Sequence, residues 1–186
     1  HMGHSSSRVG QRLQRRRALP VSSAVSVAAM QRLDETAIKT LGIPRVLLMD
    51  HAGAVVARVV RQQFPRSSAR LVICCGTGYN GGDGLCAAWH LLNAGYQPQV
   101  IVLGAISALK EEPAVFARIV TQLHGAVEQV TEVSALKTLP RRFQQADGFV
   151  DALLGIGLRG PVRPRYADMN HRINKSHKPI IAVDVP

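Results

Sequence analysis

The sequence predicts an α/β fold: a Rossmann-like, doubly wound, mostly parallel sheet with helices on both faces, in three α/β/α layers. Short apolar runs alternate along the chain with longer segments whose apolar residues recur at helical spacing. One such run, residues 71–75, enters the glycine-rich segment 76–84, and an apolar helical segment follows, as in a strand, a tight turn and a helix N-terminus. No repeat or linker interrupts residues 25–186, and alternating strands and helices of this length form parallel sheets covered on both faces.

Two helices are expected before the first strand. Ser26 is a suitable N-cap for the first, because apolar residues recur at helical spacing over residues 27–41 and Gly42 then provides a stop. Pro44 suits a first helical turn, and the second helix is expected over residues 46–64.

Five strands are expected, with a helix after each of the first four. Their apolar runs suit strands that are buried on both faces. Right-handed crossovers then join neighbouring strands into one sheet. The strands are expected at residues 71–75, 99–103, 126–130, 149–153 and 179–183, and the helices at residues 82–94, 112–124, 133–145 and 164–176.

The composition fits one domain with a sizeable core. The chain has 186 residues, of which 46% are hydrophobic and 4% aromatic, so an aliphatic core is expected. No apolar run approaches the roughly 20 residues that span a bilayer, so a membrane protein is not expected. Two of the three cysteines, Cys74 and Cys75, are adjacent in an expected strand, and the third is Cys86. This usage suits a reducing compartment, and we expect a cytoplasmic protein.

Residues 1–25 are expected to form a basic, disordered tail, and residues 26–186 the folded domain. The net charge is +11, and the first 29 residues contain five arginines and no acidic residue. Such Arg- and Ser-rich segments are typical of disordered tails and of organellar transit peptides. His1-Met2 is typical of a vector-derived start. We favour an inert tail, with organellar targeting and RNA contact left open, and do not expect nucleic acid as a partner of the domain.

Three segments rich in glycine or polar residues fall at the carboxyl ends of expected strands. They are residues 76–84, 151–160 and 184–186. In doubly wound sheets, ligands bind beyond these strand ends. We therefore expect one binding site assembled from the three segments, in which the helix that opens after residue 81 favours an anion such as phosphate.

Asp151 is the candidate catalytic residue. It closes an expected hydrophobic strand and precedes Gly155-Ile-Gly157. Desolvation beside an apolar cleft would raise the pKa of this carboxyl, so that it could act as acid and base. The alternative is a loop-capping aspartate whose carboxylate accepts hydrogen bonds from backbone N–H groups, and the sequence leaves both interpretations open.

The segment Gly76-Thr-Gly-Tyr-Asn-Gly-Gly-Asp-Gly84 closely resembles the G-x-G-N-N-G-G-D-G signature of the NAD(P)H-hydrate epimerases, the YjeF N-terminal domain family. Further stretches resemble motifs of this family in the same order, and the resemblance covers residues 25–186. These stretches are residues 30–34 with 42–44 and 48–53, then residues 150–160, and finally residues 181–186.

The resemblance implies an isomerase that interconverts the R and S forms of hydrated NADH and NADPH (NADHX and NADPHX). It implies a NAD(P)H-hydrate dehydratase as functional partner, and a homodimer is compatible with it. It also implies a potassium ion held by Asn80 and Asp151, of which Asp151 is the proton-transfer group. The residues implied in substrate binding are Tyr79, Asn80, Gly81, Gly82, Asp83, Gly155, Ile156, Gly157, Leu158, Arg159, Gly160, Pro161 and Asp184.

Structural roles remain as alternatives for several of these residues. Asn80 could be a turn residue that tolerates positive φ. Gly81 and Gly82 would let a ligand approach the backbone, but tight strand–helix packing needs glycine equally. Asp83 in a first helical turn is stabilised by the helix dipole with or without a ligand. His90 and the cysteines are expected to be structural.

Several positions depart from the family pattern. Tyr79 stands where the family has asparagine, Asp50-His51 replaces Glu-Asn, and Trp89 stands where arginine is common. The sequence ends at Pro186, before the serine that completes the family's cation site. The domain is therefore expected to end before the last strands of the family.

Two other functions compete with the epimerase. A nicotinamide-dependent oxidoreductase needs an acidic residue for the ribose near the end of the second strand, and residues 101–104 contain none, so this function is not favoured. A non-catalytic scaffold or ligand-binding domain in an RNA-processing or other assembly is the alternative that Tyr79 and the basic tail support. Retention of Asn80, Asp151 and Asp184 argues against it.

Overall fold

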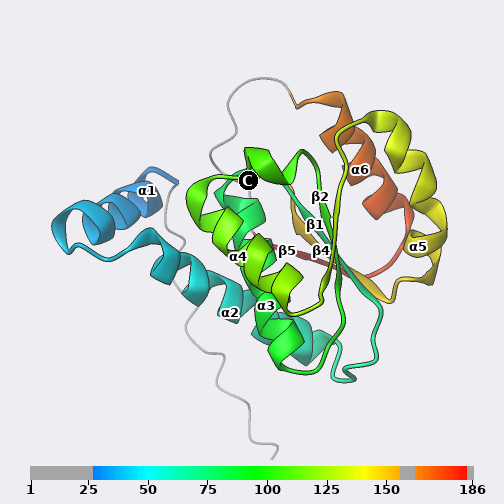
Figure 1. The fold of residues 1–186 in the computed structure, drawn as a ribbon, viewed down its shortest axis with the longest axis horizontal. Coiled ribbons are helices and arrows are strands. Elements are labelled where there is room, and N and C mark those ends of the chain that lie inside the picture. Colours follow the sequence, from blue (N-terminus) through cyan, green and yellow to red (C-terminus); the bar gives the residue numbers. More distant parts are fainter. Residues whose placement is uncertain (1–26, 156–161, 184–186) are drawn as a thin grey trace, which may run out of the picture.

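A five-stranded sheet forms the centre of the molecule (Figure 1), of which the computed structural model describes residues 27–155 and 162–183. Its strands are β1 (Leu71–Cys75), β2 (Gln99–Val102), β3 (Ala126–Gln129), β4 (Gly148–Ala152) and β5 (Ile180–Ala182). All neighbours are parallel, in the order β3-β2-β1-β4-β5. The chain thus builds outward from β1 to β3 and then returns to add β4 and β5 on the other side. This topology confirms the predicted Rossmann-like, doubly wound sheet.

Helices precede the first strand and connect each strand to the next. Most bounds lie within a few residues of those predicted. The α-helices of the described residues are α1 (Val27–Glu35), α2 (Arg45–Gln63), α3 (Tyr79–Asn93), α4 (Glu111–Gln122), α5 (Pro140–Gln145) and α6 (Pro164–Lys175), and shorter helical segments are η1 (Thr36–Thr40), η2 (Ile106–Ala108) and η3 (Val133–Thr138).

Both faces of the sheet are covered, because alternate residues of a strand point to opposite sides. Ile73 and Cys75 of β1 belong to a core shared with α2, α3 and α4, whereas Val72 and Cys74 belong to a core shared with η3, α5 and α6. Figure 1 shows the two helical layers on opposite sides of the sheet. Every residue of β1 is buried, as the continuous apolar run predicts for a central parallel strand.

Helix α3 begins at Tyr79, earlier than the predicted start at residue 82. The Gly82 N–H already donates to the Gly78 carbonyl at 3.1 Å, which is an α-helical hydrogen bond. The prediction was wrong because glycine is a poor helix former, so the glycine-rich segment was expected to be a turn. Tyr79 and Asn80 consequently lie in the first turn of a helix.

The predicted helix over residues 133–145 is two helices, η3 and α5. Pro140 occupies the first position of α5, where a missing N–H is tolerated, but it cannot donate a hydrogen bond back into η3. Leu136 and Leu139 are both fully buried, and the Leu139 N–H donates to the Leu136 carbonyl at 3.3 Å. The break therefore lets two leucines enter the same core.

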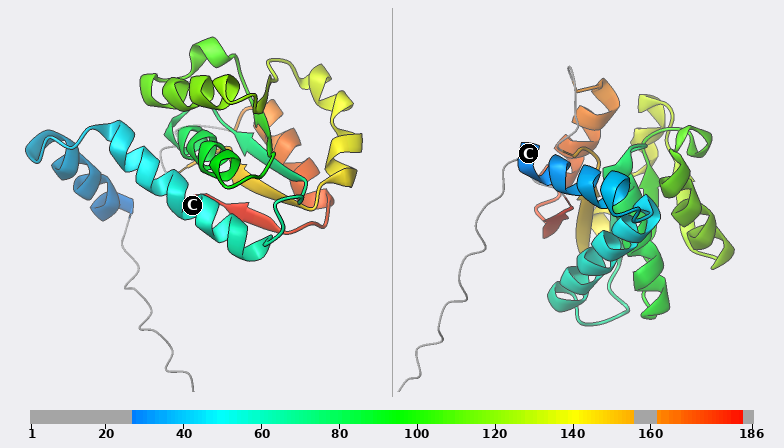
Figure 2. Two further views of the ribbon diagram at one scale, coloured as in Figure 1. Left: turned by 60° about the horizontal axis from the view of Figure 1, so that its bottom comes forward. Right: turned by 90° about the vertical axis from the view of Figure 1, so that its left-hand side faces the viewer.

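Helix α1 extends away from the sheet and its covering helices (Figures 1 and 2). Gly42 ends the segment that follows α1 with φ +68°, a left-handed conformation that favours glycine, so the predicted helix stop is confirmed. Met30, Leu33 and Leu41 are exposed, because α1 is not packed into either core. None of the helices within residues 27–155 and 162–183 is both long enough and apolar enough to cross a membrane.

Candidate active site

A cavity of about 730 Å³ opens at the carboxyl edge of the sheet. Its wall combines the start of α3, the segment after β4 and Val183, which follows β5, so two of the three segments predicted to converge share one wall, and the third, residues 184–186, lies outside the described residues. Helix α1 adds a further part of the wall. The lining residues that carry the argument are Asp34, Glu35, Arg45, Gly78, Tyr79, Asn80, Asp83, Lys110, Leu153 and Gly155.

Asn80 contributes an unsatisfied polar group to this cavity. Its side-chain Nδ2 is buried and has no hydrogen-bond partner among the described residues. A buried donor without a partner costs about 1–3 kcal/mol, so such atoms are rare in folded proteins unless a ligand or water satisfies them. Asn80 also lines the cavity, so this amide is a candidate donor to a ligand there.

Asp151 lies in β4, between Cys74 of β1 and Ala182 of β5 in the register of the sheet. Its Oδ1 accepts a hydrogen bond from the Leu153 N–H at 3.0 Å, as in the predicted capping role. Burial raises the pKa of this carboxyl, and the hydrogen bond from Leu153 offsets the rise only in part. Leu153 lines the cavity, whereas Asp151 is not among the residues of its described wall.

Tyr79 is a rim residue with two cations on its ring. The Arg45 guanidinium carbon lies 4.5 Å from the ring centroid and the Lys110 Nζ lies 4.0 Å from it, both within cation–π range. Arg45 Nε also lies 3.6 Å from a carboxylate oxygen of Glu112. All three aromatic and basic residues line the cavity, so the replacement of the family's asparagine by tyrosine is accompanied by two positive charges.

Sequence reasoning missed Arg45 and Lys110. Arg45 lies at the start of α2, between two stretches of the family resemblance, and Lys110 lies just before α4, outside every motif. The one indication in the sequence was Tyr79, which stands where the family has asparagine. A large aromatic ring in a ligand-binding segment needs neighbouring side chains to pack against it. The identity of those neighbours depends on the three-dimensional arrangement of three helices.

The glycines of the α3 segment are required by packing. A Cβ at Gly81 would lie 1.9 Å from the Gly76 carbonyl oxygen, and a Cβ at Gly82 would lie 2.6 Å from the Met49 side chain. A Cβ at Gly84 would lie 2.6 Å from that of Ala152. The packing interpretation is therefore confirmed, while a contact of Gly81 or Gly82 with a ligand stays a prediction.

The remaining predicted residues are divided between the wall and the part of the chain that is not described. Asp83 and Gly155 line the cavity. The other predicted substrate contacts lie outside the described residues, and they are Ile156, Gly157, Leu158, Arg159, Gly160, Pro161 and Asp184.

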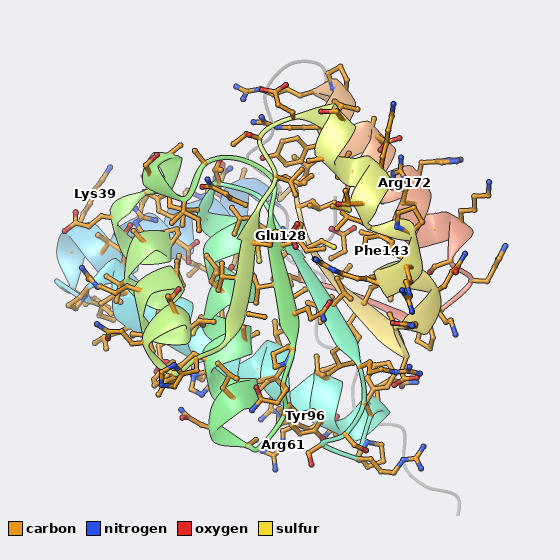
Figure 3. All side chains as sticks on the ribbon, turned by 45° about the vertical axis from the view of Figure 1, so that its right-hand side comes forward. Lys39, Arg61, Tyr96, Glu128, Phe143 and Arg172 are labelled. Atoms are coloured by element: carbon orange, nitrogen blue, oxygen red, sulfur yellow. The ribbon has the colours of Figure 1, made fainter. Side chains whose placement is uncertain are left out.

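A second cavity of about 530 Å³ lies at the amino edge of the sheet. Arg58, Arg61 and Tyr96 belong to its wall, and Figure 3 shows Arg61 and Tyr96 together at that end. Tyr96 is satisfied there, because its hydroxyl donates to the Phe64 carbonyl at 2.7 Å. Since ligands of doubly wound sheets bind at the carboxyl edge, the larger cavity is the candidate active site.

Two relatives of known name resemble this chain in sequence. A bifunctional NAD(P)H-hydrate repair enzyme Nnr of Pyrobaculum aerophilum is 42% identical over 147 residues, which are 78% of this chain and 29% of the relative. A NAD(P)H-hydrate epimerase of Limosilactobacillus fermentum is 32% identical over 163 residues, which are 88% of this chain and 74% of the relative. The chain therefore spans less than a third of the bifunctional relative and about three quarters of the epimerase.

The fold is also that of a solved structure. The crystal structure of the yeast protein ynu0 (YNL200c) superposes with a TM-score of 0.77 at 28% sequence identity, over 89% of this chain and 71% of that one.

The family model described as YjeF-related protein N-terminus matches residues 46–186, which include every strand and the whole of the segment at the start of α3. That match covers most of the chain. The chain therefore belongs to the YjeF-related protein N-terminus family.

Proposed function

We propose that this protein is a NAD(P)H-hydrate epimerase that interconverts the R and S forms of NADHX and NADPHX. The observation that carries the proposal is the convergence of the family's motif segments on one cavity that contains the unpartnered Asn80 amide. The relatives named as epimerase and repair enzyme support the substrate class.

The proposed binding mode uses the charge of the cavity. The N-terminal turn of α3 presents backbone N–H groups and the positive end of the helix dipole, which suit a diphosphate. The Asn80 Nδ2 donates to an acceptor of the same ligand. Arg45 and Lys110 at the rim lie where a phosphate of the nucleotide can approach them.

The reaction requires that the C6–O bond of the hydrated nicotinamide ring break and re-form on the other face. The leaving hydroxyl takes up a proton and departs as water, and a water that attacks the opposite face gives up a proton. Asp151 is the proposed proton carrier, since burial raises its pKa above that of an ordinary carboxyl, which favours a group that both takes up and gives up a proton. Asp83, which lies in the cavity wall itself, is the residue to compare with it.

A potassium ion is proposed to be held by the oxygens of Asn80 and Asp151. An amide carbonyl and a carboxylate are a donor set for a hard cation, and both residues belong to elements that meet at this edge of the sheet. The ion would supply positive charge that organises the segments around the substrate. Replacing potassium by sodium in the assay tests this part of the proposal.

The decisive experiment measures R-to-S conversion of NADHX by chromatography in potassium buffer, with the uncatalysed rate subtracted. Asp151→Asn and Asp83→Asn are compared at equal concentration. Acceleration by the wild-type chain that Asp151→Asn loses supports the proposal. Full activity of Asp151→Asn with loss in Asp83→Asn would move the proton role to the cavity wall, and no acceleration by the wild type would refute the epimerase.

A non-catalytic ligand-binding domain is the second candidate. The cations on Tyr79 and the hydrogen bond that engages Asp151 favour it. It predicts that NADHX binds, as measured by calorimetry, without any acceleration of epimerisation.

The functional partner, the location and the oligomeric state of the enzyme are proposals as well. A NAD(P)H-hydrate dehydratase is the functional partner that consumes the S form, since the relative named above is bifunctional. A cytoplasmic location and a homodimer complete the proposal. Sedimentation equilibrium tests the dimer.

A further inference from the structure

We propose that Asp50, Cys86 and His90 form a zinc site between α2 and α3. The inference does not depend on the proposed function, because these side chains do not belong to the described wall of the candidate active site.

The three side chains come together because of where they lie on two packed helices. Cys86 and His90 are one turn apart on α3, so they share a face of that helix, and Asp50 faces them from α2. His90 Nε2 lies 2.9 Å from Asp50 Oδ1, and Cys86 Sγ lies 3.8 Å from the same oxygen. The three ligand atoms all lie within 4.8 Å of one another.

These separations are close to those that zinc requires. Zinc bonds to sulfur, nitrogen and carboxylate oxygen measure about 2.0–2.3 Å, and tetrahedral angles then place the ligand atoms roughly 3.3–3.7 Å apart. The Nε2–Oδ1 pair must widen slightly, and since the ligand atoms lie within 4.8 Å of one another, the separations between the sulfur and the other two atoms must shrink by up to about 1 Å. Asp50 and His90 can make these adjustments, because their side chains are 41% and 25% exposed, whereas Cys86 is fully buried and stays in place.

Burial and the Asp50 carboxylate raise the pKa of the Cys86 thiol, so the thiolate ligand forms only as the metal displaces its proton. Gly53 of α2 leaves space for the sulfur, because a Cβ there would lie 2.4 Å from Cys86 Sγ. The His90 ring packs on Trp89 with the centroids 4.4 Å apart, which limits its orientations. On binding, the Cys86 proton leaves to solvent, and the thiolate and the Asp50 carboxylate together neutralise the two charges of the ion.

The donor set selects the metal. One thiolate, one imidazole and one carboxylate suit Zn²⁺ and disfavour Mg²⁺, Ca²⁺ and K⁺, which prefer oxygen ligands alone. Three protein ligands leave the fourth tetrahedral position to water, and the exposed side of the cluster provides access for it. A hydrogen-bonded contact between the helices, with no ion, is the alternative that the following test addresses.

The test is titration of the full-length wild-type chain with Co²⁺, followed by displacement with Zn²⁺. Cobalt bound to a thiolate gives an intense near-ultraviolet charge-transfer band, which histidines of the N-terminal segment cannot produce. The expected result is one equivalent of Co²⁺ with this band, which Zn²⁺ abolishes. A wild-type chain that gives no band overturns the proposal, whatever the variants do.

Three variants and one matched control locate the ligands. Cys86→Ser should abolish the band, and His90→Gln and Asp50→Asn should weaken binding by more than about 100-fold, since second-sphere changes alone cost 10–100-fold. His51→Gln, next to Asp50 in sequence, should bind as the wild type does. A band that persists in Cys86→Ser would place the metal elsewhere and overturn the assignment. Near-ultraviolet circular dichroism establishes that each variant is folded, and Zn²⁺ should raise the Tm of the wild type but not of Cys86→Ser.

Discussion

The two edges of the sheet each carry a cavity, of about 730 Å³ at the carboxyl edge and about 530 Å³ at the amino edge. Both walls contain basic side chains. The carboxyl-edge wall also contains a buried amide without a partner among the described residues, acidic side chains and the first turn of α3. At the amino edge, the Tyr96 hydroxyl is already satisfied by the chain itself. The two cavities therefore differ in their polar groups as well as in their size.

The largest effect is expected from Gly81→Ala, because the new methyl group would meet the Gly76 carbonyl oxygen, a backbone atom that cannot move aside. Overpacking of this kind costs about 3 kcal/mol or more, so we expect a chain that folds poorly and has no activity. Gly78→Ala is the matched control, since a Cβ there meets nothing within 4 Å and the backbone conformation is ordinary. Chemical denaturation compares the two, and equal stability would mean that the α3 segment packs differently.

Asp151→Asn is expected to lower the epimerisation rate by about 10²–10⁴-fold, the usual contribution of general acid–base catalysis. Asparagine keeps an acceptor for the Leu153 N–H, so the fold should persist. The pH–rate profile of the variant should lack the limb that the raised pKa of Asp151 gives to the wild type.

The raised pKa of Asp151 also has a consequence for stability. The folded state binds this proton more tightly than the unfolded chain does. The protonated Asp151 therefore contributes to the stability of the fold at acid pH, and this contribution is lost as pH rises through the raised pKa. The wild type should therefore lose stability relative to Asp151→Asn on going from acid to neutral pH. Thermal unfolding at several pH values measures this, and parallel curves would contradict it.

Asn80→Ala separates binding from folding. If a ligand accepts a hydrogen bond from the buried Nδ2, removal of the amide should lower kcat/KM by about 10–100-fold, as for a hydrogen bond to a charged group. The free energy of unfolding of the ligand-free protein should stay constant or rise, because an unpartnered buried donor is removed. A strongly destabilised variant would show that the amide has a structural partner.

Smaller effects are expected at the rim. Arg45→Gln and Lys110→Gln should each raise KM by about 3–10-fold with little change in kcat, since exposed charges contribute modestly to binding. The rise in KM should be greater for NADPHX than for NADHX if the rim contacts the additional phosphate of NADPHX. Arg61→Gln at the amino edge is the control, and a comparable rise of KM there would show that the wrong cavity was chosen.

Much of the fold could be predicted because the strands are short, apolar and separated by helices of ordinary length. Leu71–Cys75 was predicted to the residue, since a buried parallel strand is a continuous apolar run. The start of α3 was not, because the packing of Gly81 against Gly76 overrides the low helix propensity of glycine.

Only those parts of the site that belong to contiguous sequence motifs could be predicted. The convergence at the carboxyl edge follows from the topology of a parallel sheet. Arg45, Lys110 and the Asp50–Cys86–His90 cluster depend on how α2, α3 and α4 pack together, and no spacing along the chain reveals that. The structural role expected for His90 stays a prediction, and the cobalt titration tests it.

The neighbouring thiols of Cys74 and Cys75 face opposite layers of the molecule. Burial raises the pKa of both, so neither reacts as a thiolate while its layer is closed. Each cysteine is therefore a built-in reporter for one layer: its rate of modification by a thiol reagent measures how often the helices on that side separate from the sheet. Comparing the two rates in one experiment would reveal whether the protein opens as a single cooperative unit or one layer at a time.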